Sequence, residues 1–206
     1  MDLVQIGVGP WVGPWPDDER YDPVLLAEGD RRNVVDRYRY WRLEAVVADL
    51  DSRRHAFHVA VENWQHDMNI GSVVRSANAF NAAGVHIVGE RRFNRRGAMV
   101  TDRYLHLHHH PTVADLRDFA ASSSLVLVGV DNLPGAMPLE TYELPRSCLL
   151  VFGQEGPGLS AAAHEACDVV LSIAQYGSTR SINAGAAAAI AMHAWVRQHA
   201  IVPPPT

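Results

Sequence analysis

Three stretches of the sequence combine glycine with polar or charged side chains in patterns that suit the binding and reaction of a small molecule. In the first, residues 69–77, Asn69 is followed two residues later by Gly71 and six residues later by Arg75. Asn69 is a residue type that caps helices, and Arg75 would project from the second turn of such a helix. A guanidinium among small apolar residues is costly to bury without a partner, so we interpret Arg75 as functional. The alternative is a capped helix with one solvated arginine.

The second stretch, residues 149–159, is an apolar run that ends in a loop with three glycines, one proline and Glu155. Glycine lets a backbone approach a ligand closely and exposes its N–H groups. The alternative is a tight turn between a strand and a helix that Ser160 caps. The loop has neither the glycine fingerprint of dinucleotide-binding folds nor the lysine of a phosphate loop, which excludes both of those sites.

The third stretch, residues 173–186, places Ser181 and Asn183 directly before a helix whose first turns are nearly all alanine and glycine. Helix capping and close helix packing explain these residue types without any ligand. We favour a functional role because the neighbouring loop already has the composition of a ligand site.

The pattern of apolar residues predicts an α/β fold. Apolar strands are expected at 57–61, 85–88, 125–130, 148–152 and 169–173, a stretch of period two at 104–108, and helices at 33–50, 69–81, 113–121, 161–166 and 181–199. Continuous apolar strands that alternate with helices indicate a parallel sheet covered on both faces. Such sheets bind ligands beyond the carboxyl ends of their strands, and the three stretches follow strands there.

Charge and composition limit the classes of function. The net charge of −5 argues against a protein that coats nucleic acid without specificity. All eighteen basic residues are arginine, and several are clustered. One cluster holds Phe93 and Asn94 among its arginines, a mixture that suits phosphate and base contacts, so it is the predicted RNA-binding segment. Its arginines are Arg91, Arg92, Arg95 and Arg96. A solvated face is the alternative.

The remaining features predict a cytoplasmic protein with one main domain. Cys148 and Cys167 lie in or beside apolar runs and are expected to be buried free thiols. No apolar stretch reaches the roughly 20 residues of a membrane helix, and the N-terminus lacks the pattern of a signal peptide. The expected division is an N-terminal arm with an amphipathic helix capped by Asn33 at 1–52, the main domain at 53–202 and a tail at 203–206.

Taken in order, the three motifs resemble the SpoU (TrmH) family of RNA 2′-O-ribose methyltransferases in the SPOUT superfamily. The resemblance covers residues 57–196 and rests on Asn-x-Gly-x-x-x-Arg, Phe-Gly-x-Glu-x-x-Gly-Leu and Ser-x-Asn. The chain departs from the usual pattern at Ala174, Ile182 and Asn81, which changes packing more than chemistry and leaves the choice of substrate open.

This resemblance implies a parallel sheet flanked by helices with a C-terminal deep trefoil knot. It implies a homodimer that transfers a methyl group from S-adenosylmethionine to a ribose 2′-hydroxyl in tRNA or rRNA, with no metal. The catalytic and site-organising positions carried over are Asn69, Arg75, Glu155, Ser181 and Asn183. The cofactor-binding positions carried over are Val128, Gly129, Val130, Phe152, Gly153, Glu155, Gly158, Ile173, Gly177, Ser181, Ile182 and Asn183.

The residue types suit that chemistry. A sulfonium methyl group is already electrophilic, so the enzyme must align the attacking oxygen and help it to lose a proton. Since an arginine is protonated at any ordinary pH, we prefer Arg75 as an electrostatic stabiliser rather than as the base. Glu155 and Asn183 would hold Arg75 and the loop in place. We expect Arg75→Ala to abolish turnover and to leave cofactor affinity nearly unchanged.

Other interpretations stay open. His106, His108 and His110 would share a strand face as metal ligands can, but no further ligand pattern completes a shell, so RNA contact or a polar strand end is favoured. His66 and Asp67 are candidate substrate contacts. The N-terminal aromatics Trp11, Trp15, Tyr40 and Trp41 suit core packing better than RNA stacking.

Two other classes of function compete. One is a knotted RNA- or cofactor-binding protein that transfers no methyl group, which the presence of Arg75, Glu155 and Asn183 counts against. The other is a small-molecule α/β enzyme, which would need a dedicated acid–base pair or a phosphate loop.

Overall fold

The structure is a computed structural model that describes residues 7–63 and 69–200. The chain divides into two compact units, Met1–Arg53 and Arg54–Thr206. Among the described residues, no helix has both the length and the apolar character needed to cross a bilayer.

The first unit contains helix α1 (Pro23–Glu28), the 3₁₀ turn η1 (Asp36–Tyr38) and helix α2 (Leu43–Asp51). Asp22 caps α1 by accepting a hydrogen bond from the Val24 backbone N–H. The N-terminal arm therefore contains a short helix, α1, that the sequence analysis did not predict. Trp11 packs edge-on against the rings of Tyr21 and Tyr40, with centroids 6.0 and 5.3 Å apart, so these aromatics form a local core.

The helix expected at 33–50 begins only at Leu43, so its first half and the capping role of Asn33 are wrong. Asp30 is fully buried and accepts hydrogen bonds from the backbone N–H groups of Arg32 and Tyr40, both at 2.9 Å. Tyr40 has a left-handed φ of 64°. Because the buried carboxylate draws the chain into a turn, a continuous helix cannot form across this region.

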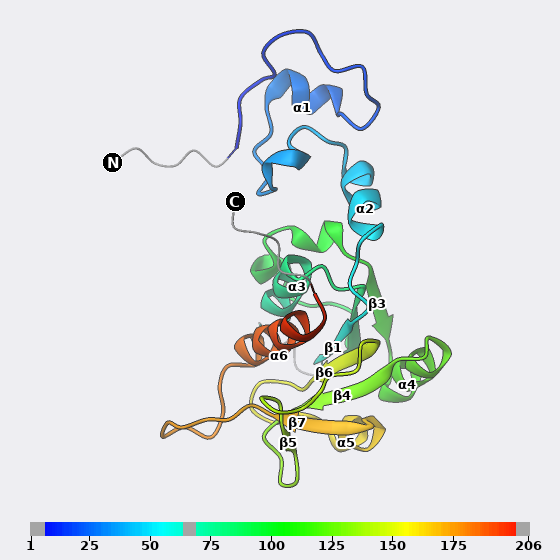
Figure 1. Ribbon diagram of the computed structural model, residues 1–206, viewed down its shortest axis with the longest axis vertical. Coiled ribbons are helices and arrows are strands. Elements are labelled where there is room, and N and C mark those ends of the chain that lie inside the picture. The colour runs from blue at the N-terminus through cyan, green and yellow to red at the C-terminus, as the bar shows by residue number, and fades with distance from the viewer. Residues whose placement is uncertain (1–6, 64–68, 201–206) are drawn as a thin grey trace. The chain divides into compact units, whose positions relative to one another are not determined.

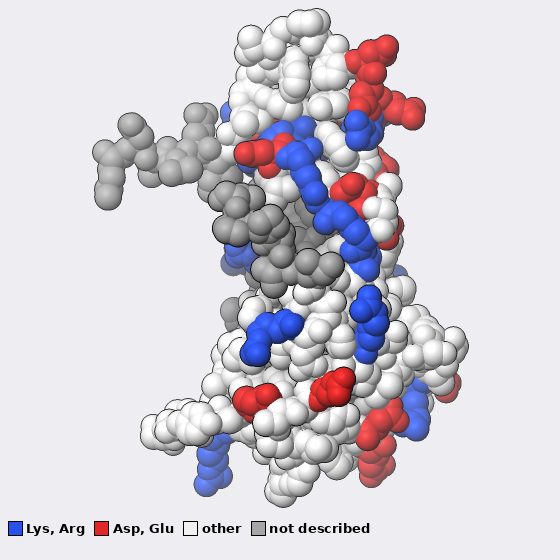
Figure 2. Space-filling model, in the orientation of Figure 1, with Lys and Arg blue, Asp and Glu red and all other residues white. Residues whose placement is uncertain are grey.

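Several arginines of this unit bind acidic side chains of the same unit. The ion pairs are Arg20–Asp18, Arg32–Asp30, Arg37–Asp49, Arg39–Asp36 and Arg53–Asp49. Figure 2 shows blue and red side chains close together on the face that it draws. A guanidinium that already has a carboxylate partner is less available to a phosphate, so these clusters are structural in character.

The second unit is built on a seven-stranded sheet, ordered β3-β2-β1-β6-β4-β7-β5, in which every neighbouring pair is parallel. Its strands are β1 (His58–Asn63), β2 (Gly84–Gly89), β3 (Leu107–His110), β4 (Val126–Val130), β5 (Met137–Pro138), β6 (Cys148–Phe152) and β7 (Val169–Ser172). The central strands β1 and β6 are almost entirely buried, as their unbroken apolar runs predict.

Helices cover both faces of this sheet (Figure 1). The cluster on one face includes α3 (Ile70–Ala79) and α6 (Ala184–His199), and that on the other includes α4 (Val113–Ser122) and α5 (Ala161–Ala166). Trp195 of α6 anchors the first face, since it packs on Phe57 at 4.7 Å between centroids and donates to the Pro145 carbonyl. The predicted α/β class with a covered parallel sheet is confirmed.

Three local predictions need correction. The period-two strand lies at Leu107–His110 rather than 104–108, because the preceding residues form two 3₁₀ helices, η2 (Arg95–Ala98) and η3 (Thr101–Tyr104). The short strand β5 was not expected. The last helix begins at Ala184 and not at Ser181, because the Asn183 side chain caps it. The trefoil knot stays a prediction.

Both cysteines are free thiols. Cys148 is buried and Cys167 half-buried, and burial raises the pKa of each thiol to about 12.

Candidate functional site

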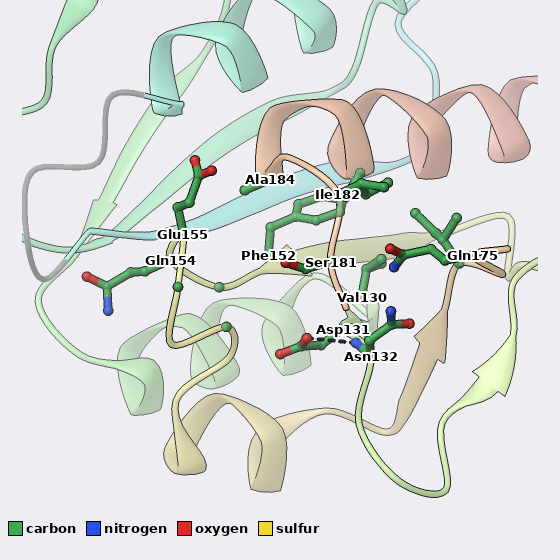
Figure 3. Close-up of a pocket in the computed structure, with 15 residues that line it drawn as sticks. Val130, Asp131, Asn132, Phe152, Gln154, Glu155, Gln175, Ser181, Ile182 and Ala184 are labelled. Atoms are coloured by element: carbon green, nitrogen blue, oxygen red, sulfur yellow. Dashed lines mark hydrogen bonds between the residues drawn. The ribbon is translucent and has the colours of Figure 1, made fainter. Parts of the chain in front are cut away.

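A pocket opens at the carboxyl ends of β4, β6 and β7, next to the first turn of α6. It contains about 700 Å³ of empty space, part of which is open to solvent. Figure 3 shows side chains from these strand ends and from the start of α6 around it. The lining residues are Val130, Asp131, Asn132, Phe152, Gly153, Gln154, Glu155, Gly156, Gly158, Ile173, Gln175, Ser181, Ile182, Ala184 and Ala187. The predicted position of a ligand site beyond the strand ends thus has a matching pocket.

The glycine-rich loop after β6 closes on itself tightly. Gln154 and Gly158 exchange backbone hydrogen bonds of 3.1 and 3.0 Å. A Cβ on Gly153 would lie 2.0 Å from the Gly158 carbonyl carbon, so only glycine fits there. Gly158 has a left-handed φ of +74°, which completes the turn.

Two carboxylates hold this loop from neighbouring strands. Glu62, fully buried at the end of β1, accepts a 2.8 Å hydrogen bond from the Ser160 backbone N–H. Asp131, after β4, accepts a 2.8 Å bond from the Leu159 backbone N–H. Ser160 in turn caps α5 as the sequence predicted. The loop is therefore fixed at its exit before any ligand binds.

Three of the predicted catalytic residues meet in one polar network. Asn183 Nδ2 donates to Asn69 Oδ1 at 2.9 Å and to Glu155 Oε2 at 3.3 Å, and Asn69 Nδ2 also donates to Glu155 Oε2. Asn183 Oδ1 accepts from the Ala186 backbone N–H, which ties the network to α6. Residues from three separate stretches of the sequence thus form one site beside the pocket, since Glu155 also lines it.

The individual roles differ from those expected. Asn69 occupies the N-cap position of α3, but its side chain makes no capping bond and serves the network instead. Arg75 is exposed on α3, and within the described residues it makes no hydrogen bond or ion pair. The idea that Glu155 and Asn183 hold Arg75 is not supported by any bond between them. The cost of burying Arg75, which we used in its favour, does not arise.

The cofactor-binding positions fall into two groups. Val130, Phe152, Gly153, Glu155, Gly158, Ile173, Ser181 and Ile182 line the pocket, whereas Val128, Gly129, Gly177 and Asn183 do not. Val128 belongs to the sheet core, and a Cβ on Gly129 would lie 3.0 Å from the Cys167 sulfur. The prediction missed Asp131, Asn132 and Gln175, although each closely follows a predicted strand and could have been found from that position.

The Arg91–Arg96 segment differs from the N-terminal arginine clusters. Arg91, Arg92 and Arg96 are exposed, and their guanidinium groups form no ion pair or hydrogen bond with residues 7–63 and 69–200. Arg95 pairs with Asp102 at 3.1 Å and lies over the Phe93 ring at 5.6 Å. Three free guanidiniums are therefore available to anions. His66 and Asp67 lie outside the described residues.

The histidines form a cluster on the sheet, at the opposite end of β1 from the network. His86 lies between His58 and His110, with ring nitrogens 3.0 and 2.8 Å apart, and stacks on His108. Burial lowers the pKa of His58 to about 4 and that of His86 to about 2, so both rings are neutral. His106 is exposed and directly precedes β3. Within the described part of the chain, no group of three ligands is arranged to hold a metal ion.

Comparison with protein families matches residues 56–193 to the SpoU rRNA Methylase family. This match spans the sheet, the pocket and the polar network.

Curated relatives agree with it. An uncharacterized tRNA/rRNA methyltransferase of Mycolicibacterium smegmatis is 32% identical over 146 residues, which cover 68% of this chain and 46% of the relative. The 23S rRNA (uridine(2479)-2′-O)-methyltransferase of Streptomyces viridochromogenes is 33% identical over 140 residues, 63% of this chain and 48% of that protein. The chain thus spans about half the length of the curated relatives it matches.

Solved structures share the fold. The SpoU methyltransferase AviRb from Streptomyces viridochromogenes, in complex with the cofactor AdoMet, aligns with a TM-score of 0.64 at 29% identity, covering 73% of this chain and 63% of that one. The A. aeolicus TrmH/SpoU tRNA modifying enzyme aligns with a TM-score of 0.67 at 19% identity, covering 76% and 82%.

Proposed function

The chain belongs to the SpoU rRNA methylase family, and we propose that it transfers a methyl group from S-adenosylmethionine to a ribose 2′-hydroxyl of tRNA or rRNA. The observation that carries this proposal is the Asn69–Glu155–Asn183 network beside the pocket. Two similarities support it. The AviRb structure is a complex with the cofactor AdoMet, and one relative is named as a 2′-O-methyltransferase of 23S rRNA.

The pocket residues fit this cofactor. Val130, Phe152 and Ile182 provide apolar walls for a planar adenine ring, and Asp131 and Gln175 provide polar groups at the rim. Gly153, Gly156 and Gly158 of the closed loop line the pocket, so the loop offers backbone rather than side chains to a ligand there. When bound, S-adenosylmethionine supplies an electrophilic methyl group.

The chain's own residues would then orient the acceptor. A ribose hydroxyl is a poor acid, so positive charge near its oxygen lowers the energy of the developing alkoxide. Arg75 is the predicted source of that charge, and the network would fix the position of the pocket rim. The exposed guanidinium of Arg75 could be contacted by a second copy of the chain or by the RNA, and either would complete the site. A homodimer therefore stays part of the proposal, as do a cytoplasmic location and independence of metals.

Methyl transfer from radiolabelled S-adenosylmethionine to bulk tRNA and bulk rRNA tests the activity. The wild type should label at least one of them. Arg75→Ala should lower turnover by about 100-fold or more, while the Kd for S-adenosylmethionine stays within about two-fold of the wild type. A comparable loss of cofactor affinity in Arg75→Ala would refute the assignment. RNA binding without incorporation would instead favour the binding-protein alternative.

RNA contact is assigned to the arginine segment, residues 91–96. Three exposed arginines without partners suit three phosphates, whereas Arg95 is engaged by Asp102. Replacing Arg91, Arg92 and Arg96 by alanine should weaken RNA binding and reduce the slope of log K against log salt by about 2. Arg95→Ala is the matched control and should change the slope least.

A further inference from the structure

Asn63, the last residue of β1, uses its side-chain amide to hydrogen-bond the backbone of the arginine segment. It is fully buried, and its Nδ2 donates to the Glu90 carbonyl at 2.6 Å and to the Arg92 carbonyl at 2.9 Å. The Glu90 backbone N–H also donates to the Asn63 carbonyl at 2.8 Å. Three hydrogen bonds therefore join residue 63 to residues 90–92.

A glycine contact holds the other end of the same segment. A Cβ on Gly71, in the first turn of α3, would lie 2.8 Å from the Ala98 nitrogen and from the Gly97 Cα. A Cβ on Gly97 would likewise lie 3.1 Å from the Gly71 carbonyl carbon. The backbone of η2 thus lies directly against the first turn of α3. This helix begins just after Asn69 and carries Arg75 in its second turn.

These two attachments join the backbone that carries the free guanidiniums to β1 and to α3. Arg91 and Arg92 lie at the Asn63 contact, and Arg96 lies in the 3₁₀ turn that touches Gly71. A phosphate bound by these arginines would lie at a fixed offset from α3 only if both attachments hold. If either attachment were lost, the arginines would occupy many positions and would bind RNA more weakly.

The Asn63 side chain is unusual for a residue with a purely structural role. Its Oδ1 is buried and accepts no hydrogen bond from the described residues. A buried oxygen without a partner opposes folding, so replacing the amide with an apolar group of similar size removes this penalty together with the two donated bonds. Glu90 and Arg92 are exposed residues, so once the amide no longer holds the segment their carbonyls can turn to water. Asn63→Leu should therefore change stability little.

We propose that Asn63 is a positioning residue for RNA: it fixes the arginine segment relative to α3, so that phosphates bound by Arg91, Arg92 and Arg96 are in register with the Asn69–Glu155–Asn183 network. This inference rests on the proposed function for the nature of the ligand. It concerns RNA binding, and it leaves the cofactor pocket unaffected.

A double-mutant cycle with the full chain tests it. Fluorescein-labelled bulk tRNA and labelled 23S rRNA fragments are titrated with wild type, Asn63→Leu, the triple alanine variant of Arg91, Arg92 and Arg96, and the combination of both. Asn63→Leu should weaken binding of the tighter RNA by about ten-fold, and the combination should bind no more weakly than the triple variant, because Asn63 acts through those arginines. The thermal midpoint and the Kd for S-adenosylmethionine should match the wild type.

The inference is overturned if Asn63→Leu binds RNA as the wild type does, if the two effects add fully, if cofactor affinity falls in parallel, or if the wild type binds neither RNA. Methyl transfer separates this inference from the proposed function. A protein that shows the expected cycle but labels no RNA would refute the activity and support the role of Asn63. A protein that methylates RNA but binds it equally well after Asn63→Leu would support the activity and refute the role of Asn63.

Discussion

Gly153→Ala is the sharpest test of the pocket, because the structure gives the size of the perturbation. The added Cβ would lie 2.0 Å from the Gly158 carbonyl carbon, 2.1 Å from its oxygen and 2.2 Å from the Leu159 nitrogen. Ordinary contact begins at 3.4 Å, so the two sides of the loop must separate by about 1.4 Å. All three atoms are backbone, and no side-chain rotation can relieve the clash.

That separation would break both hydrogen bonds between Gln154 and Gly158. Each is worth about 0.5–1.5 kcal/mol net, so closing the loop on a ligand would cost about 1–3 kcal/mol more than in the wild type. Since 1.4 kcal/mol is a factor of ten, the Kd for S-adenosylmethionine should rise by about 5- to 140-fold. The rest of the unit should stay folded, because the clash is confined to one loop.

Gly156→Ala is the matched control in the same loop. Its Cβ would meet no atom within 4 Å, so its only cost is the left-handed φ of +93°. That strain is about 1 kcal/mol, equivalent to about a five-fold loss of affinity. Isothermal titration with S-adenosylmethionine measures both variants, and circular dichroism confirms that both are folded. Binding of S-adenosylmethionine by Gly153→Ala that is as tight as that of the wild type would refute the proposed pocket.

Three further predictions concern the fold. Burial lowers the pKa of His58 to about 4 and of His86 to about 2, below the ordinary value of 6.5, so these rings stay neutral while the unfolded chain takes up protons. The free energy of unfolding should therefore be highest above pH 6.5. It should fall as the pH drops below that value, by up to about 1.4 kcal/mol per pH unit for each ring. A urea midpoint unchanged between pH 7 and pH 5 would contradict this. Cys148 is buried and its pKa is raised to about 12, so it should not react with a disulfide reagent at pH 8 until urea unfolds the chain, whereas the half-buried Cys167, whose pKa is also raised to about 12, should react slowly. Fast labelling of Cys148 in the native protein would show its burial to be wrong. Trp195→Ala should lower the free energy of unfolding by about 3–5 kcal/mol, since the indole is buried and bonded to the Pro145 carbonyl; a urea titration that finds less than 1 kcal/mol, about the worth of one hydrogen bond, would argue against that packing.

Much of the second unit could be predicted because its signals are local. The apolar runs of β1, β4, β6 and β7 and the turns between them depend on neighbouring residues, so strand order along the chain and the parallel class followed directly. The helix at 33–50 failed for the opposite reason. Its periodicity was sound, but a buried carboxylate at Asp30 imposes a turn that periodicity does not register.

The site divides in the same way. From residue types and spacing along the chain, Asn69, Glu155 and Asn183 were identified as candidate site residues that follow strands. Only the tertiary structure decided what each does, because Asn69 and Asn183 are 114 residues apart in the sequence and hydrogen-bond to each other at the starts of α3 and α6. This bond makes the expected helix cap Asn69 part of a network. The same holds for Asn63 and for Arg75. The first is committed to carbonyls 27 and 29 residues away, and the second is left free in solvent. A hydrogen bond depends on the distance between two atoms in space, and a sequence records only their separation along the chain.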